Sequence, residues 1–377
     1  MKMGILSPDS AYYPNIGHQF TTALIKSGPG VDIEWIVESV GNGSDLNRVK
    51  SLMEQMIQVE KVDILVLFLE FGVVEKLKLW MQDYSKLFIV VNTGANYPKD
   101  WTPVCNIVFL HLNQAFCCRL TGNSAGAMFR EAILATNEYD EGYLQTEAIA
   151  TAFERQDGKV VQRFVSKAAP KAPPNKAEVL AVFSFITKPT AILLMTDYEP
   201  GLALLKIMQK LPNAEYLSIF ASPMLLNGGQ MPIPENGWPF SITGYTPWHS
   251  MNEASRYQLF DSSIIDNTSE KQDIFSLLGW ETGMLLHEWF AVSGRKPATW
   301  DAAKLTGVAL SSPRGMLSFD PVNHHFSAPV NRLHLAKNSH DWEVDAGIDF
   351  DQEWAIFSRY FHPVNLMEAS DTTYPCY

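Results

Sequence analysis

Polar and aromatic residues follow several short apolar runs of the sequence, and these side chains are the ones best suited to binding a small molecule. Hydroxyl and amide groups can hold a polar group of a ligand, while aromatic rings beside them cover its apolar part. The alternative is that such residues only end the strands. In the first half of the chain the turns read Ser7-Pro8-Asp9-Ser10-Ala11-Tyr12-Tyr13, Leu69-Glu70-Phe71-Gly72 and Asn92-Thr93-Gly94-Ala95-Asn96. In the second half they read Asn137-Glu138-Tyr139-Asp140-Glu141-Gly142-Tyr143 and Asp197-Tyr198-Glu199-Pro200.

A second candidate for chemistry is the run Gly122-Asn123-Ser124-Ala125-Gly126, which matches the G-x-S-x-G pattern of the nucleophile elbow in serine hydrolases. Asp320 together with His324 or His325 would be available as its triad partners. An elbow needs a buried strand that ends at the first glycine. Residues 115–121 instead contain Arg119 and fit the end of a helix that Gly122 caps. We therefore expect no enzyme, and a serine hydrolase remains the alternative function.

The segments that would position these turns alternate between strand-like and helix-like patterns. Short apolar or alternating runs predict strands over residues 3–7, 32–38, 62–68, 87–91, 131–136, 160–164 and 190–196. Longer segments predict helices over residues 15–27, 45–60, 73–83, 144–156, 176–185, 200–210 and 270–293, whereas the prolines within 231–248 predict irregular structure. The side-chain oxygen of Asp45 is expected to cap the second of these helices, and Gly294 to end the last. This alternation predicts an α/β fold with two Rossmann-like lobes, each a parallel sheet flanked by helices. Ligands bind beyond the carboxyl ends of the strands in such sheets, so the turns above are where a site is expected.

The composition excludes several classes of function. The 377 residues include 29 Lys and Arg against 41 Asp and Glu, a formal net charge of −12, which disfavours a nucleic-acid or anionic-membrane partner. The longest apolar runs are strand-sized, far below the ~20 residues of a membrane helix. The first residues lack the charged and apolar regions of a secretory signal. We expect either a cytoplasmic protein or one whose signal was removed before residue 1.

The cysteines carry no metal-binding pattern. Cys105, Cys117, Cys118 and Cys376 form no C-x-x-C pair and have no histidines at zinc-finger spacing. A disulfide between Cys105 and either Cys117 or Cys118 is open if the compartment is oxidising. Two adjacent cysteines on a helix can equally be small buried hydrophobic residues.

Other motifs for metals and nucleotides are equally weak. His324-His325 supplies only two adjacent side chains, and two loop histidines are the simpler interpretation. The acidic run Asp341-Trp342-Glu343-Val344-Asp345 lacks EF-hand spacing, which favours a solvated face over a calcium site. Neither a Walker A motif nor a G-x-G-x-x-G motif after a strand occurs. We therefore expect no cofactor.

The order of the strand-end turns resembles the periplasmic solute-binding proteins of the branched-chain amino-acid type, the type I periplasmic binding proteins. The resemblance covers nearly the whole chain and rests on the order and spacing of short pieces rather than on any one of them. In sequence order the pieces are Tyr13-Pro14-Asn15-Ile16-Gly17, Val62-Asp63-Ile64-Leu65-Val66, Asn92-Thr93-Gly94-Ala95-Asn96-Tyr97-Pro98, Tyr139-Asp140-Glu141-Gly142-Tyr143, Leu278-Gly279-Trp280-Glu281-Thr282-Gly283 and Ser312-Pro313-Arg314-Gly315-Met316-Leu317-Ser318-Phe319-Asp320.

The resemblance implies two α/β lobes that are joined by three hinge crossovers, near Phe109, Trp248 and Pro329, and close around a ligand. The implied lobes are residues 1–109 with 249–329, and residues 110–248 with 330–377. A non-enzymatic protein is implied that captures a small polar organic ligand and presents it to the permease of an ABC importer. A periplasmic location and a monomeric state are expected with it, and a cytoplasmic ligand sensor of the same fold is an alternative.

Matched position by position, the resemblance places the ligand contacts on the turns described above. Thr93, Asn96 and exposed backbone N–H groups could hold a carboxylate, while tyrosine rings cover the apolar part of the ligand. Trp248 is included because it lies near an expected hinge. The residues expected to bind the ligand are Tyr13, Phe71, Gly72, Thr93, Gly94, Ala95, Asn96, Tyr139, Asp197, Tyr198 and Trp248.

One turn departs from the pattern of the amino-acid binders in this family. Where they place an acidic residue for the ligand's ammonium group, this chain reads Phe220-Ala221-Ser222-Pro223-Met224. Asp197 or Glu199 could substitute, although a carboxylate there could instead cap the helix that begins near Pro200. The departure argues against an ordinary aliphatic amino acid and leaves an amino-acid-like molecule, an amide or an organic acid as the expected ligand.

Overall fold

The chain divides into two compact units, each built around its own sheet. The computed structural model describes residues 1–30, 33–96, 101–137, 143–167, 173–251, 259–260, 273–294, 300–345 and 348–360. Unit 1 holds the described residues of 1–112 and 252–329, and unit 2 holds those of 113–251 and 330–360. Both sheets are mostly parallel, so each unit has the α/β architecture that the alternation of segments predicts.

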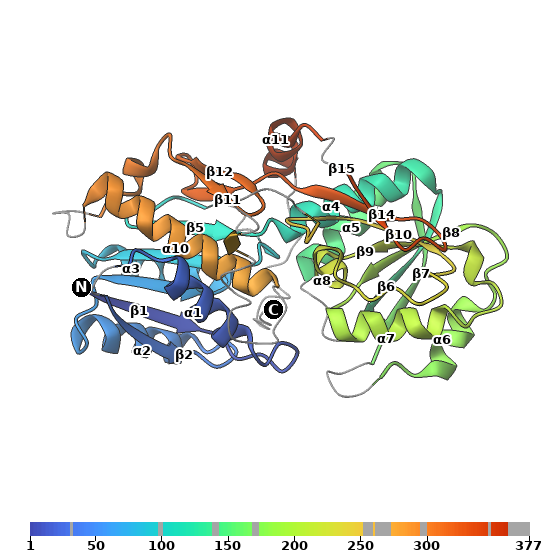
Figure 1. Ribbon diagram of the computed structural model, residues 1–377, viewed down its shortest axis with the longest axis horizontal. Coiled ribbons are helices and arrows are strands. Elements are labelled where there is room, and N and C mark those ends of the chain that lie inside the picture. Colours follow the sequence, from blue (N-terminus) through green and yellow to red (C-terminus); the bar gives the residue numbers. More distant parts are fainter. Residues whose placement is uncertain are drawn as a thin grey trace. The chain divides into compact units, whose positions relative to one another are not determined.

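Unit 1 contains an eight-stranded sheet in its described residues, with the order β11-β12-β13-β5-β4-β3-β1-β2 (Figure 1). The strands are β1 (Lys2–Ser7), β2 (Glu34–Ser39), β3 (Ile64–Phe68), β4 (Leu87–Asn92), β5 (Ile107–His111), β11 (Ala309–Ser312), β12 (Gly315–Asp320) and β13 (His325–Ser327). Strands β1 to β5 and β13 are parallel, while β11 and β12 form an antiparallel hairpin at the edge. The central strands are apolar throughout because helices cover both of their faces.

The helices of unit 1 are α1 (Ile16–Ser27), α2 (Leu46–Gln58), α3 (Phe71–Gln82) and α10 (Ile274–Ser293). Helices α2 and α3 pack on one face of the sheet, and α1 and α10 pack together on the other (Figure 1). The predicted cap of α2 is confirmed, since Asp45 Oδ1 accepts the N–H groups of Asn47 and Arg48 at 3.0 and 3.1 Å. Helix α10 ends at Gly294 as predicted. The start of α2 and the end of α10 therefore lie where their local sequence signals place them, whereas α3 begins two residues before its predicted start and α10 begins four residues after it.

Unit 2 contains a seven-stranded sheet in its described residues, with the order β15-β14-β10-β9-β8-β6-β7. The strands are β6 (Glu131–Asn137), β7 (Lys159–Ser166), β8 (Thr190–Met195), β9 (Leu217–Ala221), β10 (Ser241–Thr246), β14 (Asn331–Leu335) and β15 (Trp342–Asp345). The helices are α4 (Gln114–Met128), α5 (Tyr143–Arg155), α6 (Lys176–Phe183), α7 (Tyr198–Met208), α8 (Pro223–Leu226) and α11 (Phe350–Tyr360). Short 3₁₀ turns occupy Ala214–Tyr216, Asn227–Gly229 and, in unit 1, Ala302–Leu305.

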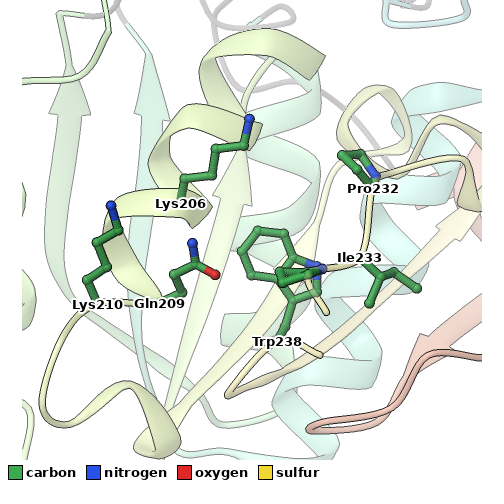
Figure 2. Close-up of a pocket in the computed structure, with 7 residues that line it drawn as sticks. Lys206, Gln209, Lys210, Pro232, Ile233 and Trp238 are labelled. Carbon is green, nitrogen blue, oxygen red and sulfur yellow. The ribbon is translucent and has the colours of Figure 1, made fainter. Parts of the chain in front are cut away.

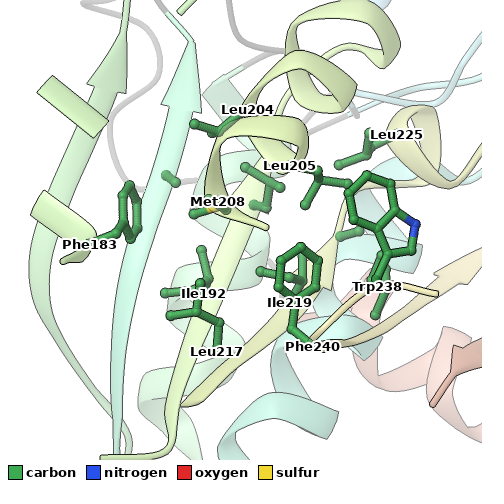
Figure 3. Packing of buried hydrophobic residues seen from close by; sticks show 14 of the residues in the cluster. Phe183, Ile192, Leu204, Leu205, Met208, Leu217, Ile219, Leu225, Trp238 and Phe240 are labelled. Carbon is green, nitrogen blue, oxygen red and sulfur yellow. The ribbon is translucent and has the colours of Figure 1, made fainter. Parts of the chain in front are cut away.

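The unit 2 sheet is covered on both faces by apolar side chains. Helices α6 and α7 pack over one face, where Leu205 and Met208 meet Ile192 and Ile219 of the central strands (Figure 3). Helices α4 and α5 pack over the other face. Covering both faces fixes the sheet and leaves the residues at its strand ends accessible to a ligand.

The irregular structure predicted for residues 231–248 is wrong in part. Strand β10 lies within this region and pairs parallel with β9 and antiparallel with β14. The prolines at positions 232, 234, 239 and 247 all lie outside the strand, so none of them removes a hydrogen bond of the ladder.

Candidate ligand-binding site

Three strand-end turns of unit 1 lie at one edge of its sheet. Strands β1, β3 and β4 are parallel neighbours, so their carboxyl ends point the same way. The turns that follow them begin at Ser7, Leu69 and Asn92, respectively. The structure therefore brings together three of the turns that the sequence singled out, and each contributes polar groups to this edge.

The turn after β4 is held by its own hydrogen bonds. Asn92 Nδ2 donates to the carbonyl of Leu69 at 3.2 Å, which joins this turn to the one after β3. Asn92 Oδ1 accepts the N–H of Gly94 at 2.9 Å, and Gly94 has a φ of 71°, a left-handed conformation that glycine adopts readily. Thr93 and Ala95 are buried. The turn is thus a fixed feature of the strand end rather than a loose connection.

Glu70 lies directly in front of α3 and points its carboxyl group toward the turn after β4. Its Oε2 atom accepts a hydrogen bond from Asn96 Nδ2 at 3.3 Å, while its Oε1 atom is buried and has no partner in the described part of the chain. Burial raises the pKa of Glu70 to about 7, and the hydrogen bond from Asn96 acts in the opposite direction. Glu70 was not among the residues expected to bind a ligand. A charged residue immediately after a fully apolar strand is the signal that could have found it.

The expected contacts of the first half occupy different environments. Tyr13 is half-buried and meets the ring of Phe275 edge-on, with centroids 5.0 Å apart. Phe71 is only 2% exposed, and its ring stacks on that of Phe109 at 4.6 Å, so it belongs to the core below the turn. Gly72 is exposed, and a Cβ atom there would meet nothing within 4 Å. The open space at this edge therefore lies beside Gly72.

The strand ends of unit 2 carry a second set of polar groups. Strands β6 and β8 are parallel neighbours, and Asn137 Nδ2 donates to Asp197 Oδ2 at 3.4 Å where they end. Asp197 precedes α7 but makes no side-chain hydrogen bond to that helix, so its carboxylate faces Asn137 rather than capping α7. Tyr198 is half-buried, and its pKa is raised by burial and by the charge of Glu199. Tyr139 lies outside the described residues.

The remaining expected contact is a packing residue of unit 2. Trp248 is 1% exposed, and its ring lies against Gly228, where an added Cβ would come within 2.8 Å of the indole. Ser222, from the turn that lacks the acid, caps the short helix α8 by accepting the N–H of Leu225 at 3.1 Å. The hydroxyl group of Ser222 is therefore already hydrogen-bonded to the backbone.

The run Gly122-Asn123-Ser124-Ala125-Gly126 is not a nucleophile elbow. It lies inside α4, which continues to Met128, so the predicted helix end at Gly122 is also wrong. The glycines are needed for packing against α5. A Cβ on Gly122 would lie 2.2 Å from the carbonyl oxygen of Ile149. Ser124 therefore sits within a regular helix and not at a strand-to-helix turn, which removes the hydrolase alternative.

The interpretation of two loop histidines is wrong for His325, which lies in β13 with its Nδ1 2.9 Å from His111 Nε2. Of the two alternatives left open for the cysteines, the structure supports small buried residues: Cys117 and Cys118 are buried in α4, and no disulfide forms among the described cysteines. The searched part of the chain contains no group of three or more His, Cys, Asp or Glu side chains placed to hold a metal. Among the helices described, none is both long and apolar enough to span a bilayer.

A pocket of about 360 Å³ lies elsewhere on unit 2 (Figure 2). Its walls are Lys206, Gln209 and Lys210 at the end of α7, facing Pro232, Ile233, Pro234 and Trp238. Helix α7 starts beyond the carboxyl end of β8 and runs back along the sheet, so its last turn lies near the amino ends of the strands. The pocket is therefore at the opposite end of the sheet from the expected site.

Comparison with known proteins shows the fold. No protein-family model and no curated protein matches the sequence. Among solved structures, a solute-binding protein of an ABC transporter from R. palustris in complex with benzoate matches at 20% identity, covering 91% of this chain and 94% of that chain, with a TM-score of 0.67. A solute-binding protein from Rhodopseudomonas palustris HaA2 in complex with p-hydroxybenzoic acid matches at 15% identity, covering 94% and 99%, with a TM-score of 0.71. A branched-chain amino acid transporter substrate-binding protein from Streptococcus pneumoniae in complex with isoleucine matches at 14% identity, covering 92% and 99%, with a TM-score of 0.61.

The first two of these structures are solute-binding proteins of ABC transporters, and the third is the substrate-binding protein of an amino acid transporter. The coverage extends over nearly the whole of each chain, which agrees with the extent of the resemblance in the sequence. At these identities the comparison establishes architecture rather than ligand. The chain has the two-lobed α/β fold of the type I periplasmic binding proteins.

Proposed function

We propose that this chain is a non-enzymatic solute-binding protein that captures a small organic ligand for an ABC importer. The observation that carries the proposal is the clustering of polar and aromatic turns at the carboxyl ends of neighbouring parallel strands, in a fold shared with ABC solute-binding proteins. The proposed contacts in unit 1 are Tyr13, Gly72 and the turn 93–96. In unit 2 they are Tyr139, Asp197 and Tyr198. Phe71 of unit 1 and Trp248 of unit 2 support these turns by packing and do not contact the ligand.

The proposed ligand is an organic acid with an apolar or aromatic body. Two of the similar structures hold benzoate and p-hydroxybenzoic acid, and a third holds isoleucine. The turn Phe220-Ala221-Ser222-Pro223-Met224 lacks the acidic residue that an ammonium group would need, which supports an acid over an aliphatic amino acid. The Tyr13 ring, with Phe275 edge-on beside it, offers an apolar wall to such a body.

The remaining parts of the proposal concern location and partners. A solute-binding protein of this type works in the periplasm as a monomer and hands its ligand to the membrane permease. The excess of acidic side chains, which gives a net charge of −12, is compatible with a soluble carrier and unfavourable for binding nucleic acid.

A ligand screen tests this proposal directly. The screen contains benzoate, 4-hydroxybenzoate, leucine and isoleucine, and we expect the aromatic acids to raise the melting temperature most, because a ligand at about 1,000 times its dissociation constant adds about 4 kcal/mol to stability. Calorimetric titration then gives the affinity. Failure of every member to shift the melting temperature or to give binding heat would contradict the proposed function.

A variant of Tyr198 tests the position of the site. Tyr198→Ala should weaken binding of the identified ligand by about 1–3 kcal/mol, since it removes an aromatic wall and a hydroxyl group. Tyr216→Ala is the matched control, because Tyr216 is an exposed tyrosine of the same unit and lies in the turn before β9. Equal affinity of the wild type and Tyr198→Ala would show that the site lies elsewhere.

A further inference from the structure

Glu70 occupies the centre of the strand-end edge of unit 1. It follows β3, and β3 lies between β4 and β1 in the sheet. Asn96, from the turn after β4, reaches it with a hydrogen bond of 3.3 Å. Gly72, two residues along the chain, borders open space. The carboxyl group of Glu70 therefore lies among the turns to which the proposed function assigns the ligand.

Among the described residues, the carboxyl group of Glu70 has fewer partners than it could bind. Glu70 stands at the N-cap position of α3, yet its side chain makes no capping hydrogen bond to that helix. The ion pairs formed by the described residues do not include it. Its Oε1 atom is buried without a hydrogen-bond partner in the described part of the chain. A buried acceptor left unsatisfied costs about 1–3 kcal/mol, so a role in stability alone does not account for it.

The chemistry of a buried carboxyl group limits what can lie next to it. Burial raises the pKa of Glu70 to about 7, so a substantial fraction of the protein carries an ionised group here at neutral pH. A ligand carboxylate placed beside it would meet a like charge. A hydroxyl or ammonium group would instead supply the donor that Oε1 lacks, in a charge-assisted hydrogen bond.

We propose that Glu70 Oε1 accepts a hydrogen bond from a donor group of the bound ligand, so that the ligand is an organic acid bearing a separate hydroxyl or ammonium group. This inference rests on the proposed solute-binding function and makes Glu70 a residue that determines specificity. Asn96 is its positioning partner, because its amide holds the other carboxyl oxygen. The ligand's own carboxylate binds away from Glu70.

Pairs of probes that differ by a single donor group test the inference. The first pair is benzoate and 4-hydroxybenzoate, which differ by a hydroxyl. The second is 4-methylpentanoate and leucine, which share a carbon skeleton and differ by the ammonium group. Calorimetric titration should show that, in one pair, the member with the donor binds the wild type about tenfold to hundredfold more tightly. The pair in which this preference appears identifies the donor as hydroxyl or ammonium.

Variants of Glu70 then connect the preference to this side chain. Glu70→Ala should reduce the ratio of affinities toward one, and Glu70→Gln, which keeps the shape but loses the charge, should reduce it in part. Glu75→Gln is the matched control, because Glu75 is an exposed residue of the same helix, and it should keep the wild-type ratio. Melting curves of the ligand-free variants establish that each is folded before titration.

The outcomes separate this inference from the proposed function. If a probe binds but its partner without the donor binds equally well, or if Glu70→Ala keeps the wild-type ratio, the inference is overturned and the solute-binding function stands. A loss of preference in Glu75→Gln equal to that in Glu70→Ala would also overturn it. If no probe binds the folded wild type, the proposed function fails and the inference fails with it.

Discussion

Two glutamates of unit 1 with buried carboxyl oxygens, the fully buried Glu281 and the half-buried Glu70, show how differently the same side chain can be accommodated. Glu281, in the middle of α10, accepts hydrogen bonds from Arg314 Nε at 2.8 Å and from Arg314 Nη2 at 3.0 Å. Ser312 donates a third hydrogen bond to it, and Arg314 Nη2 also donates to the carbonyl of His111 at 2.9 Å. Glu70 has a single amide hydrogen bond of 3.3 Å and one oxygen without a partner in the described residues.

The difference separates a structural acid from one that is available to a ligand. The Glu281 carboxylate joins α10 to the β11–β12 hairpin and, through Arg314, to the end of β5, all within unit 1. The bidentate Arg314 side chain neutralises the buried charge of Glu281. The Glu70 carboxyl group has one long hydrogen bond, and its second oxygen can still accept another. Removing a partner of Glu281 should therefore lower the stability of the protein, whereas removing the charge of Glu70 should raise it.

The largest effect is expected from breaking the Glu281–Arg314 pair. Arg314→Ala should lower the free energy of unfolding by about 3–5 kcal/mol, because it leaves the Glu281 carboxylate buried and uncompensated. Urea denaturation of the ligand-free protein measures this. Lys188→Ala is the control, because it breaks the exposed Lys188–Glu131 pair and should change stability far less. Similar losses in the two variants would mean that the buried pair does not hold unit 1 together.

A second effect concerns His325, whose ring contacts His111, the residue that accepts a hydrogen bond from Arg314. The His325 ring also contacts the rings of Phe71 and Phe109. Burial is the main cause that lowers the pKa of His325 to about 3, well below the 6.5 of an exposed histidine, and the nearby His324 lowers it further. The unfolded chain therefore takes up a proton below pH 6.5 that the folded protein does not. Stability should fall by about 1.4 kcal/mol per pH unit from 6.5 downward, or about 2 kcal/mol by pH 5.

His325→Gln tests this pH dependence, because glutamine keeps a polar side chain but does not titrate. The variant should be less stable than the wild type at pH 7, and the difference between the two should shrink as the pH falls to 5. Denaturation curves at both pH values measure it. An unchanged difference would show that His325 binds its proton equally well in the folded and unfolded chain.

Much of the fold could be predicted from local sequence signals. The helix predicted over residues 45–60 is α2, and its cap Asp45 is confirmed by two hydrogen bonds. The apolar run predicted over 62–68 contains β3. These features depend on residues close together in the chain, and so a pattern of burial and capping is enough to find them.

The errors arise where contacts between distant residues decide. Gly122 reads locally as a helix end, but it is a mid-helix residue that lets α5 approach α4 closely. Phe71 reads as a ligand contact, but its ring is enclosed by Phe109 and by His325, which is more than 250 residues away in sequence. The turns of the candidate site could thus be placed from the sequence. Which side chains in them are buried, and which carboxyl oxygen is left without a partner, could not.

Glu70→Gln should stabilise the folded protein at pH 8, whereas changes in the Glu281–Arg314 pair should destabilise it. The folded pKa of Glu70, about 7, lies above its ordinary value of 4.5, so its ionisation costs the folded protein nothing below pH 4.5 and the full penalty above pH 7. Relative to wild type, Glu70→Gln should gain about 1–3 kcal/mol of stability on going from pH 4.5 to pH 8. Glu281→Gln should instead be destabilising at pH 8. Urea denaturation at both pH values compares them, and a loss of stability in Glu70→Gln that is the same at both would contradict the raised pKa.

The smallest effect is expected from Asn96→Ala, which removes the hydrogen bond that the described residues supply to the Glu70 carboxyl group. That bond favours the ionised form, so its loss should raise the pKa of Glu70 further and lower stability at pH 8 by less than about 1 kcal/mol. At pH 4.5, where the carboxyl group of the folded protein is protonated, the change should be smaller still. Asn47→Ala, at an exposed position of α2, controls for the loss of an asparagine and should show the same change at both pH values. If Asn96→Ala behaves like Asn47→Ala, the amide does not hold Glu70, and the two glutamates differ even more in the number of groups that bind their carboxyl oxygens.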